Sequence, residues 1–203
     1  MGRVTCDMAM SLDGFVAGPN QSLENPLGEG MEDRVHGWLW ERDPADVAAI
    51  DAITAAGAFI MGRNMFGPVR GGWDTWDGEW RGWWGEEPPY HAPVFVLTHH
   101  PREPLEMQGG TTFFFVTDGI ESALDQARAA AGEDDVAVAG GAATVRAYLN
   151  AGLIDELRLH VTPALLGVGE RLFDGVRGVR LEQVDASGSR AVTHLRYRTV
   201  RPT

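Results

Sequence analysis

The stretch VAVAGGAATVRAYLNAGLIDEL, residues 136–157, decides the fold. It begins with a short apolar run that is typical of a buried strand, and it continues as a helix to about Ala151. Gly140 and Gly141 stand between the two. Adjacent glycines are common in a plain strand-to-helix turn. They also leave bare backbone N–H groups at a helix start, where phosphate binds, so both interpretations are open.

The composition of the chain limits the kinds of function that it can have. Its 203 residues suit one domain, which we expect to extend over residues 1–203, and a content of 44% hydrophobic and 23% charged residues is typical of a globular protein. The net charge of −12 argues against nucleic acid and against an anionic membrane as partners. The N-terminal residues lack the features of a secretory signal, and no apolar run is long enough to span a membrane. We therefore expect a cytoplasmic protein.

The scarcity of cysteine and lysine excludes several kinds of functional site. Cys6 is the single cysteine, which excludes an internal disulfide and a cysteine-rich metal site. All 17 basic residues are arginine. Without lysine the chain cannot form a Schiff base or supply the lysine of a P-loop. The six histidines are scattered, only His99 and His100 are adjacent, and we expect no metal.

Strand and helix patterns alternate along the chain. Short apolar or alternating runs predict strands, and longer periodic runs after a capping residue predict helices. Asp43, followed by Pro44, is expected to cap one helix and Asp118 another. The predicted strands are 3–10, 58–61, 93–98, 112–116, 136–139, 154–162, 179–184 and 191–200, the last two joined as a hairpin across 186–189. The predicted helices are 31–41, 44–56, 119–131 and 141–151.

This alternation predicts an α/β fold with helices on both faces of a central sheet. In such sheets, ligands bind beyond the carboxyl ends of the strands. Loops leave the predicted strands after Met10, Met61, Leu97 and Ala139. If these strands are parallel, the four loops converge on one ligand.

Four motifs resemble those of known reductases. AMSLDGFVAG (9–18) and GLIDELRLHVTPALLGVGERLF (152–173) are similar to the reductase domain of bifunctional riboflavin-biosynthesis deaminase-reductases. FIMGRNMF (59–66) and VLTHHPR (96–102) resemble the two loops with which dihydrofolate reductases hold the adenine end of NADPH. The resemblance implies a dihydrofolate-reductase-like domain with a mixed, mostly parallel sheet and a C-terminal β-hairpin. It also implies NADPH as the hydride donor.

The resemblance assigns most candidate site residues to the cofactor. Arg63 would place its guanidinium on the 2′-phosphate of NADPH, although an ordinary exposed arginine is the alternative. The Gly-Gly turn would carry the pyrophosphate, whose charge a helix dipole favours. The cofactor-binding residues implied are Ala9, Val16, Ala17, Gly62, Arg63, Asn64, Thr98, His99, Gly140, Gly141, Ala142, Ala143 and Thr144.

Asp13 and a tryptophan-rich segment are the candidates for the substrate side. In riboflavin reductases the aspartate that matches Asp13 lies beside substrate and nicotinamide, so Asp13 is the candidate catalytic residue and proton relay, although Leu-Asp-Gly is also a good turn. Residues 71–85 hold five of the seven tryptophans, which would either cover a core edge or a subunit contact, or wall a flat substrate. Trp73 and Trp76 are the candidate pocket residues. Further candidate proton donors are Asp74, Asp77 and Glu79, and the helical carboxylate of dihydrofolate reductases has no clear match although Glu32 and Asp33 are nearby.

Two departures from the riboflavin-reductase pattern bear on the substrate. Asp7 stands where those enzymes typically carry lysine, and Ala139 stands where they carry glutamate before the Gly-Gly pair. The aspartate would replace attraction for a phosphorylated substrate by repulsion. We therefore expect a main substrate other than the riboflavin intermediate.

The sequence supports two functions. One is an NADPH-dependent oxidoreductase that transfers a hydride from nicotinamide C4 to a C=N or C=O carbon of a small heterocycle, pteridine- or pyrimidine-like, resembling 5-amino-6-(5-phosphoribosylamino)uracil reductase. The other is an NADPH-binding structural or regulatory dimer with little turnover. Riboflavin enzymes of this class commonly pair, and strand 191–200 has an apolar face, so we expect a homodimer.

Overall fold

The computed structural model describes residues 2–68, 71–75, 82 and 84–200. The strands are β1 (Val4–Ser11), β2 (Phe15–Ala17), β3 (Ala58–Gly62), β4 (Pro93–Leu97), β5 (Leu105–Glu106), β6 (Thr112–Val116), β7 (Val136–Gly140), β8 (Glu156–Thr162), β9 (Glu170–Arg171), β10 (Arg180–Gly188) and β11 (Thr193–Val200). The α-helices are α1 (Glu32–Val35), α2 (Gly37–Glu41), α3 (Val47–Ile53), α4 (Arg63–Phe66), α5 (Ile120–Ala131) and α6 (Ala142–Asn150). Short 3-10 turns occur at Trp73–Thr75 and Gln108–Gly110.

One mixed sheet organises the described residues. Its nine strands follow the order β10-β11-β8-β1-β7-β3-β4-β6-β5. The strands from β8 to β6 are parallel, whereas β11, β10 and β5 are antiparallel to their neighbours. β2 and β9 pair separately. The predicted fold class, a mostly parallel sheet with a C-terminal hairpin, is confirmed.

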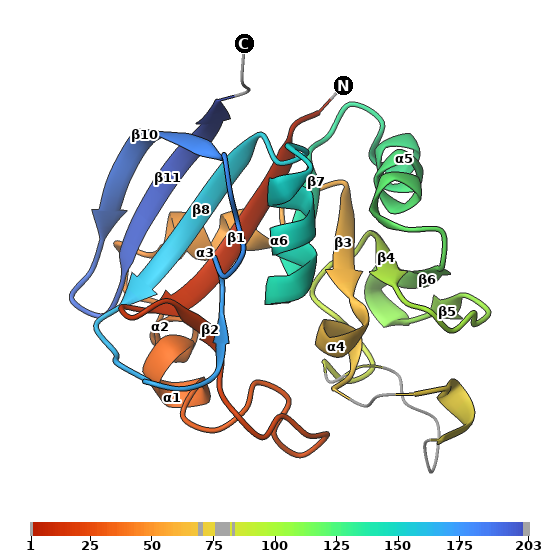
Figure 1. The fold of residues 1–203 in the computed structure, drawn as a ribbon, viewed down its shortest axis with the longest axis horizontal. Helices are drawn as coiled ribbons and strands as arrows, with labels where there is room; N and C mark the ends of the chain where they lie inside the picture. The colour runs from red at the N-terminus through yellow and green to blue at the C-terminus, as the bar shows by residue number, and fades with distance from the viewer. Residues whose placement is uncertain (1, 69–70, 76–81, 83, 201–203) are drawn as a thin grey trace.

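Helices cover both faces of the sheet, as parallel strands require for their crossover connections. On one face Leu124 of α5 and Val145 of α6 pack against Ile60 and Val138 of the sheet. On the other face Val35 of α1 lies in a small apolar cluster beside β1 and β8. α6 lies in front of the sheet in Figure 1 and α3 lies behind it. Among the described helices, none combines the length and the apolar character that crossing a membrane demands.

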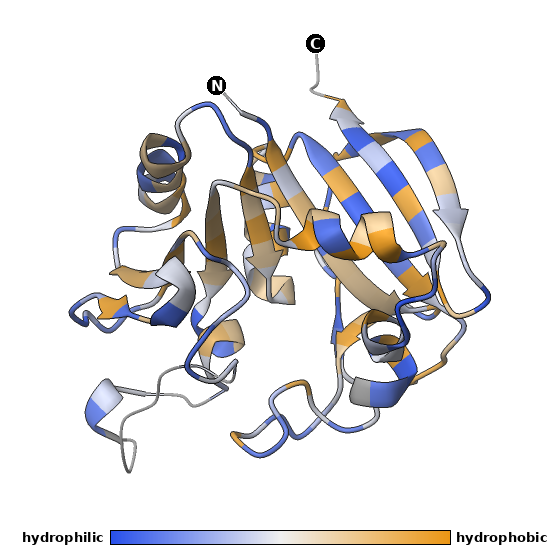
Figure 2. Ribbon diagram, turned by 180° about the vertical axis from the view of Figure 1, so that it is seen from behind, coloured by the Kyte–Doolittle hydropathy of each residue, from blue (hydrophilic) through white to orange (hydrophobic). Residues whose placement is uncertain are grey.

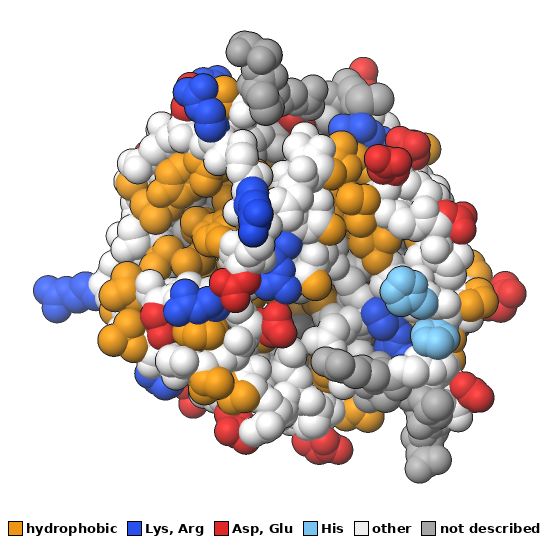
Figure 3. All heavy atoms as spheres, in the orientation of Figure 1, with side chains coloured by type: hydrophobic (Ala, Val, Ile, Leu, Met, Phe, Trp, Pro, Cys, Tyr) orange, Lys and Arg blue, Asp and Glu red, His pale blue; other side chains and the backbone are white. Residues whose placement is uncertain are grey.

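The hairpin β10–β11 extends the sheet at one edge. Figure 2 shows hydrophilic and hydrophobic bands that alternate along these two strands, whereas the central strands are hydrophobic over most of their length. Every residue of β10 is exposed, and the side chains of Leu181 and Val184 are 39% and 48% exposed. Figure 3 shows apolar side chains gathered over the hairpin at the left of the view. This edge therefore keeps open apolar surface in the single chain.

Two helices expected in the N-terminal part differ from the prediction. The helix predicted over 31–41 is divided into α1 and α2 at His36. The helix predicted over 44–56 begins only at Val47, with Asp46 at the N-cap. The side chain of Asp43 instead accepts a hydrogen bond from Ala45 N at 2.9 Å, which holds a turn ahead of the helix.

Two further boundaries were wrong for local reasons. Asp118 does not cap α5, because Gly119 occupies the N-cap with a φ of +93°. The hairpin turn lies after Gly188 and not across 186–189, because Gly188 still pairs with Thr193. The strands β2, β5 and β9 were not predicted, since two or three residues are too few to show an alternating pattern.

Candidate functional site

The carboxyl ends of four neighbouring strands form the candidate site. β1, β7, β3 and β4 are consecutive in the sheet and parallel. The loops that follow them therefore emerge side by side at one edge. Adjacent strands lie about 4.8 Å apart, so this edge is about 14 Å wide from β1 to β4. The parallel arrangement that the predicted convergence required is confirmed.

The turn between β7 and α6 is made of Gly140 and Gly141. Gly140 has a φ of +126°, which favours glycine, and its peptide bond to Gly141 is cis. Gly141 is the N-cap of α6. A methyl group built on Gly141 would meet no atom within 4 Å, so the backbone here borders open space. The first N–H groups of a helix have no partner within it, and those of Ala142 and Ala143 begin α6 at this open edge.

Gly62 and Thr144 bring two of the predicted cofactor segments together. Gly62 ends β3 and precedes α4, and Thr144 lies in the first turn of α6. A methyl group on Gly62 would collide with Oγ1 of Thr144, so the close approach requires glycine. Thr144 is only 9% exposed. The strand end and the helix start thus lie in contact, as one binding surface for a ligand would need.

Arg63 lies in an aromatic cluster with a second arginine that the sequence did not single out. Its Cζ is 3.6 Å from the centre of the Trp73 ring, and Cζ of Arg102 is 4.9 Å from the same ring. Arg63 also donates a hydrogen bond to Gly67 O at 3.3 Å. Burial lowers the pKa of Arg63 to about 10, and repulsion by Arg102 contributes. Both guanidinium groups remain charged at neutral pH, so the cluster concentrates positive charge beside the end of β3.

Thr98 stabilises the start of the loop after β4 through two hydrogen bonds. Thr98 N donates to Val116 O at 3.0 Å, and its Oγ1 accepts a hydrogen bond from His100 N at 3.1 Å. His99 is exposed and His100 is half-buried. Trp73 Nε1 donates to His100 O at 2.8 Å, which joins this loop to the arginine cluster. The structure therefore brings Thr98 and His99 to the same edge as Arg63.

Asn64 connects this part of the edge with the long loop after β2. Its Nδ2 donates to Oε1 of Gln21 at 3.1 Å. Gln21 in turn donates to Pro26 O at 2.9 Å within its own loop. Asn64 thus contacts a loop that the sequence had not placed at the site.

Asp13 joins the loop after β1 to the loop after β8. Its carboxylate accepts hydrogen bonds from Ser11 Oγ at 2.6 Å, from Leu166 N at 3.1 Å and from Gly167 N at 2.7 Å. The Ser11 hydroxyl is the first cause of a lowered Asp13 pKa of about 2, and the backbone N–H groups contribute. An acid with this pKa is ionised at neutral pH and is a poor proton donor. Through these contacts Asp13 holds the two loops together, and its catalytic role stays a prediction.

The other residues expected near the nicotinamide are mostly buried. Val16 and Ala17 lie in β2 and are 8% and 9% exposed. Val16 packs in the main core cluster and Ala9 packs beside Met31 and Val35 of the α1 region. Any contact of these residues with a ligand would use their backbone and small apolar surfaces.

Trp73 lies with Phe66 and Phe115 beside the ends of β3 and β6, whereas Asp13 lies in the loop after β1 and contacts the loop after β8. That Trp73 and Asp13 line one substrate pocket stays a prediction. Trp84 donates to the Tyr90 hydroxyl at 3.0 Å, so both described tryptophans of the segment cover an aromatic core edge. Trp76, Asp77 and Glu79 lie outside the described residues, and Asp74 is exposed.

Asp7 does not face the site, contrary to the expectation from the lysine-to-aspartate change. Its side chain is 6% exposed and lies 3.4 Å from Arg158 Nη1. Its charge is therefore compensated inside the sheet and cannot repel a substrate in the way expected. Ala139 remains half-buried near the end of β7, where the change from glutamate leaves a smaller and uncharged side chain.

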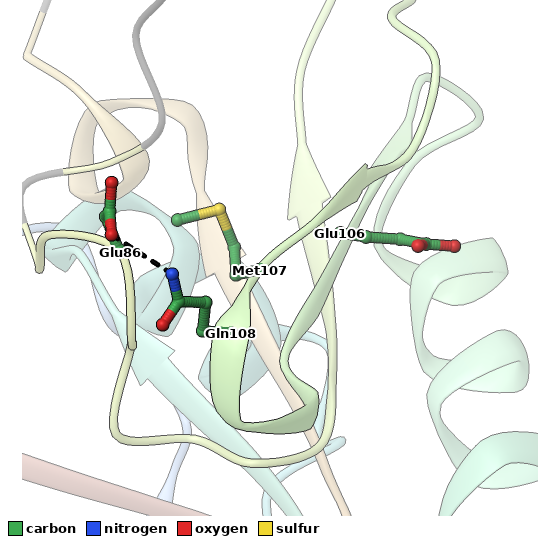
Figure 4. Close-up of a pocket in the computed structure, with 4 residues that line it drawn as sticks. All are labelled: Glu86, Glu106, Met107 and Gln108. Atoms are coloured by element: carbon green, nitrogen blue, oxygen red, sulfur yellow. Dashed lines mark hydrogen bonds between the residues drawn. The ribbon is translucent and has the colours of Figure 1, made fainter.

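A pocket of about 310 Å³ lies at the opposite edge of the sheet (Figure 4). Glu86, Met107 and Gln108 line it, and Gln108 donates to Glu86 at 3.0 Å. Glu106 also lines it but points away from the other three in Figure 4. Since β5 pairs with the beginning of β6, this pocket is remote from the strand ends that form the candidate site. Among the described residues, no three His, Cys, Asp or Glu side chains are grouped so as to hold a metal.

Comparison with known protein families shows to which family the chain belongs. The sequence model of the RibD C-terminal domain matches residues 3–194. The chain belongs to the RibD C-terminal domain family. The YyaP protein of Bacillus subtilis (strain 168) is 25% identical over 179 residues, which cover 86% of this chain and 82% of YyaP.

Two solved structures show the fold that this RibD C-terminal domain protein shares with reductases. The diaminohydroxyphosphoribosylaminopyrimidine deaminase/5-amino-6-(5-phosphoribosylamino)uracil reductase of Thermotoga maritima has a TM-score of 0.63 and 17% identity, covering 98% of this chain and 57% of that one. The dihydrofolate reductase of Enterococcus faecalis, solved with NADP(H), has a TM-score of 0.53 and 14% identity, covering 98% and 96%. The resemblance deduced from the sequence motifs is confirmed at the level of family and fold.

Proposed function

We propose that the protein is an NADPH-dependent reductase of a small heterocyclic substrate. The observation that carries the proposal is the placement of the Gly140-Gly141 turn and the Arg63–Arg102 pair along one edge of the sheet. One feature suits a pyrophosphate and the other suits a terminal phosphate. A dinucleotide with a 2′-phosphate carries both groups.

The residues present fit this cofactor. The open backbone at Gly141 and the start of α6 would bind the pyrophosphate through N–H groups, aided by the helix dipole. Arg63 and Arg102 would bind the 2′-phosphate, because planar guanidinium groups suit phosphate oxygens and a phosphate relieves their mutual repulsion. Thr98 and His99 would border the adenine end. Ala9, Val16 and Ala17 would border the nicotinamide.

Bound NADPH supplies a hydride, and the chain supplies position. Asp13 fixes the loop after β1 to the loop after β8, which would hold the substrate side of the site in one geometry. The apolar surface around Ala9 would exclude water from the bound reactants. The proton that must accompany the hydride would come from water or from a side chain other than Asp13.

The substrate we propose is pteridine- or pyrimidine-like, with a C=N or C=O carbon that accepts the hydride. The riboflavin intermediate remains disfavoured as the main substrate. Because Asp7 is buried beside Arg158, this expectation rests on Ala139 and on the net charge of −12, which does not attract a phosphorylated compound. Steady-state kinetics with the ribosylaminopyrimidine phosphate test it: a kcat/KM of roughly 10⁴ M⁻¹s⁻¹ or more would contradict it.

We also propose a cytoplasmic homodimer that pairs through the hairpin edge. β10 is exposed along its whole length and carries the open side chains of Leu181 and Val184. Burial of such an edge against a second copy removes both its apolar surface and its unpaired backbone groups from water.

One observation favours the second function, an NADPH-binding dimer with little turnover. Asp13 accepts three hydrogen bonds and is ionised, so the candidate catalytic acid is engaged in structure. The two functions differ in turnover. Purified protein should oxidise NADPH in the presence of at least one member of a panel of pterins, pyrimidines and quinones. NADPH binding without oxidation by any of them would support the second function.

A further inference from the structure

The ring of Trp73 connects the two loops that carry the arginine pair. Arg63 begins α4 directly after β3, and Arg102 lies in the loop after β4. Cζ of Arg63 is 3.6 Å from the centre of the Trp73 ring, and Cζ of Arg102 is 4.9 Å from it. Both distances are within the about 6 Å over which an aromatic face attracts a cation. One side chain from a third segment of the chain therefore joins the two arginines.

The distance of 3.6 Å determines how Arg63 lies on the ring. Carbon atoms in contact are about 3.5–4.0 Å apart, so a guanidinium carbon this close to the ring centre lies directly over the ring face. A guanidinium that stood upright on the ring would push a nitrogen into it, so the two planes are close to parallel. A guanidinium donates its N–H groups only within its own plane. The orientation of the Trp73 ring therefore sets the directions in which Arg63 donates.

The Trp73 ring is itself held on several sides. Its Nε1 donates a hydrogen bond to His100 O at 2.8 Å. The ring centres of Phe115 and Phe66 lie 5.0 Å and 5.9 Å away, with interplanar angles of 72° and 81°. These are edge-to-face contacts, which favour one orientation of the ring. Since Phe66 is only 1% exposed, the aromatic cluster is anchored in the core.

Arg102 lies over the same aromatic cluster. Its Cζ is 5.2 Å from the Phe115 ring and 6.0 Å from the Phe66 ring. Repulsion by Arg102 contributes to the lowered pKa of Arg63, so the two charges are close enough to interact. Like charges on long side chains separate in water unless a favourable contact opposes their repulsion. The contacts with the aromatic rings supply that opposition and keep the two charges together.

We propose that Trp73 is a positioning residue for Arg63 and Arg102, and that through them it determines the preference for NADPH over NADH. The ring holds both guanidinium groups before the cofactor binds. A 2′-phosphate then does not have to order two flexible side chains on binding, and its affinity is higher for that reason. This inference rests on the proposed function, because it assigns Trp73 to the phosphate of that cofactor. It gives Trp73 a role other than a wall of the substrate pocket.

A purely structural role is the alternative for Trp73, which packs beside the aromatic core cluster. In that case, loss of the ring would disturb the whole edge and weaken both nucleotides alike. Under the proposal, the affinity for NADH changes little, because NADH lacks the 2′-phosphate. The Kd for NADH divided by the Kd for NADPH, which we call the discrimination ratio, separates the two roles.

Trp73→Leu removes the aromatic face and keeps an apolar side chain. Calorimetric titration should show that the discrimination ratio falls at least about threefold and at most about thirtyfold, the range that corresponds to the loss of a cation–π contact. Trp84→Leu is the matched control. It removes a half-buried ring that packs beside the same core cluster and donates to the Tyr90 hydroxyl, and it should keep the wild-type ratio.

Two further variants test whether Trp73 acts through its ring face and through Arg63. Trp73→Phe keeps an aromatic face and should lose less of the discrimination ratio than Trp73→Leu. In an Arg63→Ala background, Trp73→Leu should lower the ratio less than it does in the wild type, because its main target is already absent. Equal falls in Trp73→Phe and Trp73→Leu, or equal falls in the two backgrounds, would overturn the proposal.

The wild type provides a measurement if Trp73→Leu fails to fold. In the free protein, the ring current of Trp73 should shift the NMR signals of the Arg63 side chain upfield, and Arg63→Ala assigns these signals. NADPH should change the Nε–H signals of both Arg63 and Arg102, whereas NADH should not.

The outcomes distinguish this inference from the proposed function. A wild type without any preference for NADPH would contradict the proposed function and this inference with it. A preference that Arg63→Ala removes and Trp73→Leu leaves intact would overturn this inference alone. So would the absence of the upfield shift in the free protein.

Discussion

The guanidinium carbon of Arg63 lies 3.6 Å from the centre of the Trp73 ring, and that of Arg102 lies 4.9 Å from the same ring. Two like charges share one aromatic platform, and burial together with Arg102 lowers the pKa of Arg63 to about 10. A bound phosphate would relieve this repulsion and accept hydrogen bonds from both groups. If the proposed cofactor binds here, the discrimination between NADPH and NADH should be the property most sensitive to Arg63.

Arg63→Ala should remove most of the preference for NADPH. The loss of one charge-assisted hydrogen bond costs about 1.5–3 kcal/mol, so NADPH affinity should fall roughly 10- to 150-fold while NADH affinity changes little. Calorimetric titration with both nucleotides measures this. Arg177→Ala, at an exposed position outside the site, is the matched control and should keep the preference. Equal affinities for NADPH and NADH in the wild type would refute the assignment of Arg63.

Gly141→Ala should weaken both nucleotides without disturbing the fold. The φ of Gly141 is −70°, which alanine adopts readily, and the added methyl group would meet no protein atom within 4 Å. The methyl group would instead occupy the space in which we place the pyrophosphate. We expect a loss of at least about tenfold, or 1.4 kcal/mol, in affinity for NADPH and NADH alike, with an unchanged Tm. Unchanged affinity in a well-folded variant would place the pyrophosphate elsewhere.

Asp13→Asn should act on structure more than on proton transfer. The lowered pKa of about 2 means that the Asp13 carboxylate stabilises the fold above its unfolded pKa near 3.9, and that this stability is lost as pH falls through about 2. Between pH 5 and 9 its charge is constant. The pH profile of kcat should therefore show no ionisation that Asp13→Asn removes, and the Tm should fall because the links to Leu166 and Gly167 weaken. An acidic limb that disappears in the variant would restore Asp13 as a proton donor.

The homodimer is tested by light scattering. The wild type should have twice the 22.1 kDa mass of the chain at micromolar concentration. Val184→Glu places a charge on the exposed hairpin edge and should produce monomers. Val168→Glu changes a valine that is 58% exposed on the loop after β8 and should leave the mass unchanged. A wild-type particle of 22.1 kDa would rule the dimer out.

The central elements of the fold could be predicted because their signals are local. Short apolar runs predict the buried strands β3, β4, β6 and β7. The Gly-Gly turn likewise predicts the change from strand to helix after β7. The alternation of strands and helices then implies a parallel sheet, which places the loops of the site at one edge. The positions of Arg63 and Thr98 at this edge could be predicted in the same way, since each residue directly follows a strand.

The features that escaped prediction depend on contacts between distant residues. Asp43 has the local signature of an N-cap, but the contact between Asp46 and His194 helps to fix where α3 begins. Arg102 has no distinctive neighbours in sequence and gains its importance from the Trp73 ring. The sequence alone predicts that Asp7 faces the substrate, because its neighbours Arg158 and His160 on β8 are known only once the sheet is assembled.

A titration of isotope-labelled protein with NADPH, followed by backbone amide NMR, tests the central claim most directly. We predict that the largest shifts fall on the amides of residues 140–144, 62–64 and 98–100, and that NADH shifts the first group while affecting the second much less. Absence of binding would contradict the account. So would shifts that concentrate around the pocket at Glu86 and Gln108, on the opposite edge of the sheet.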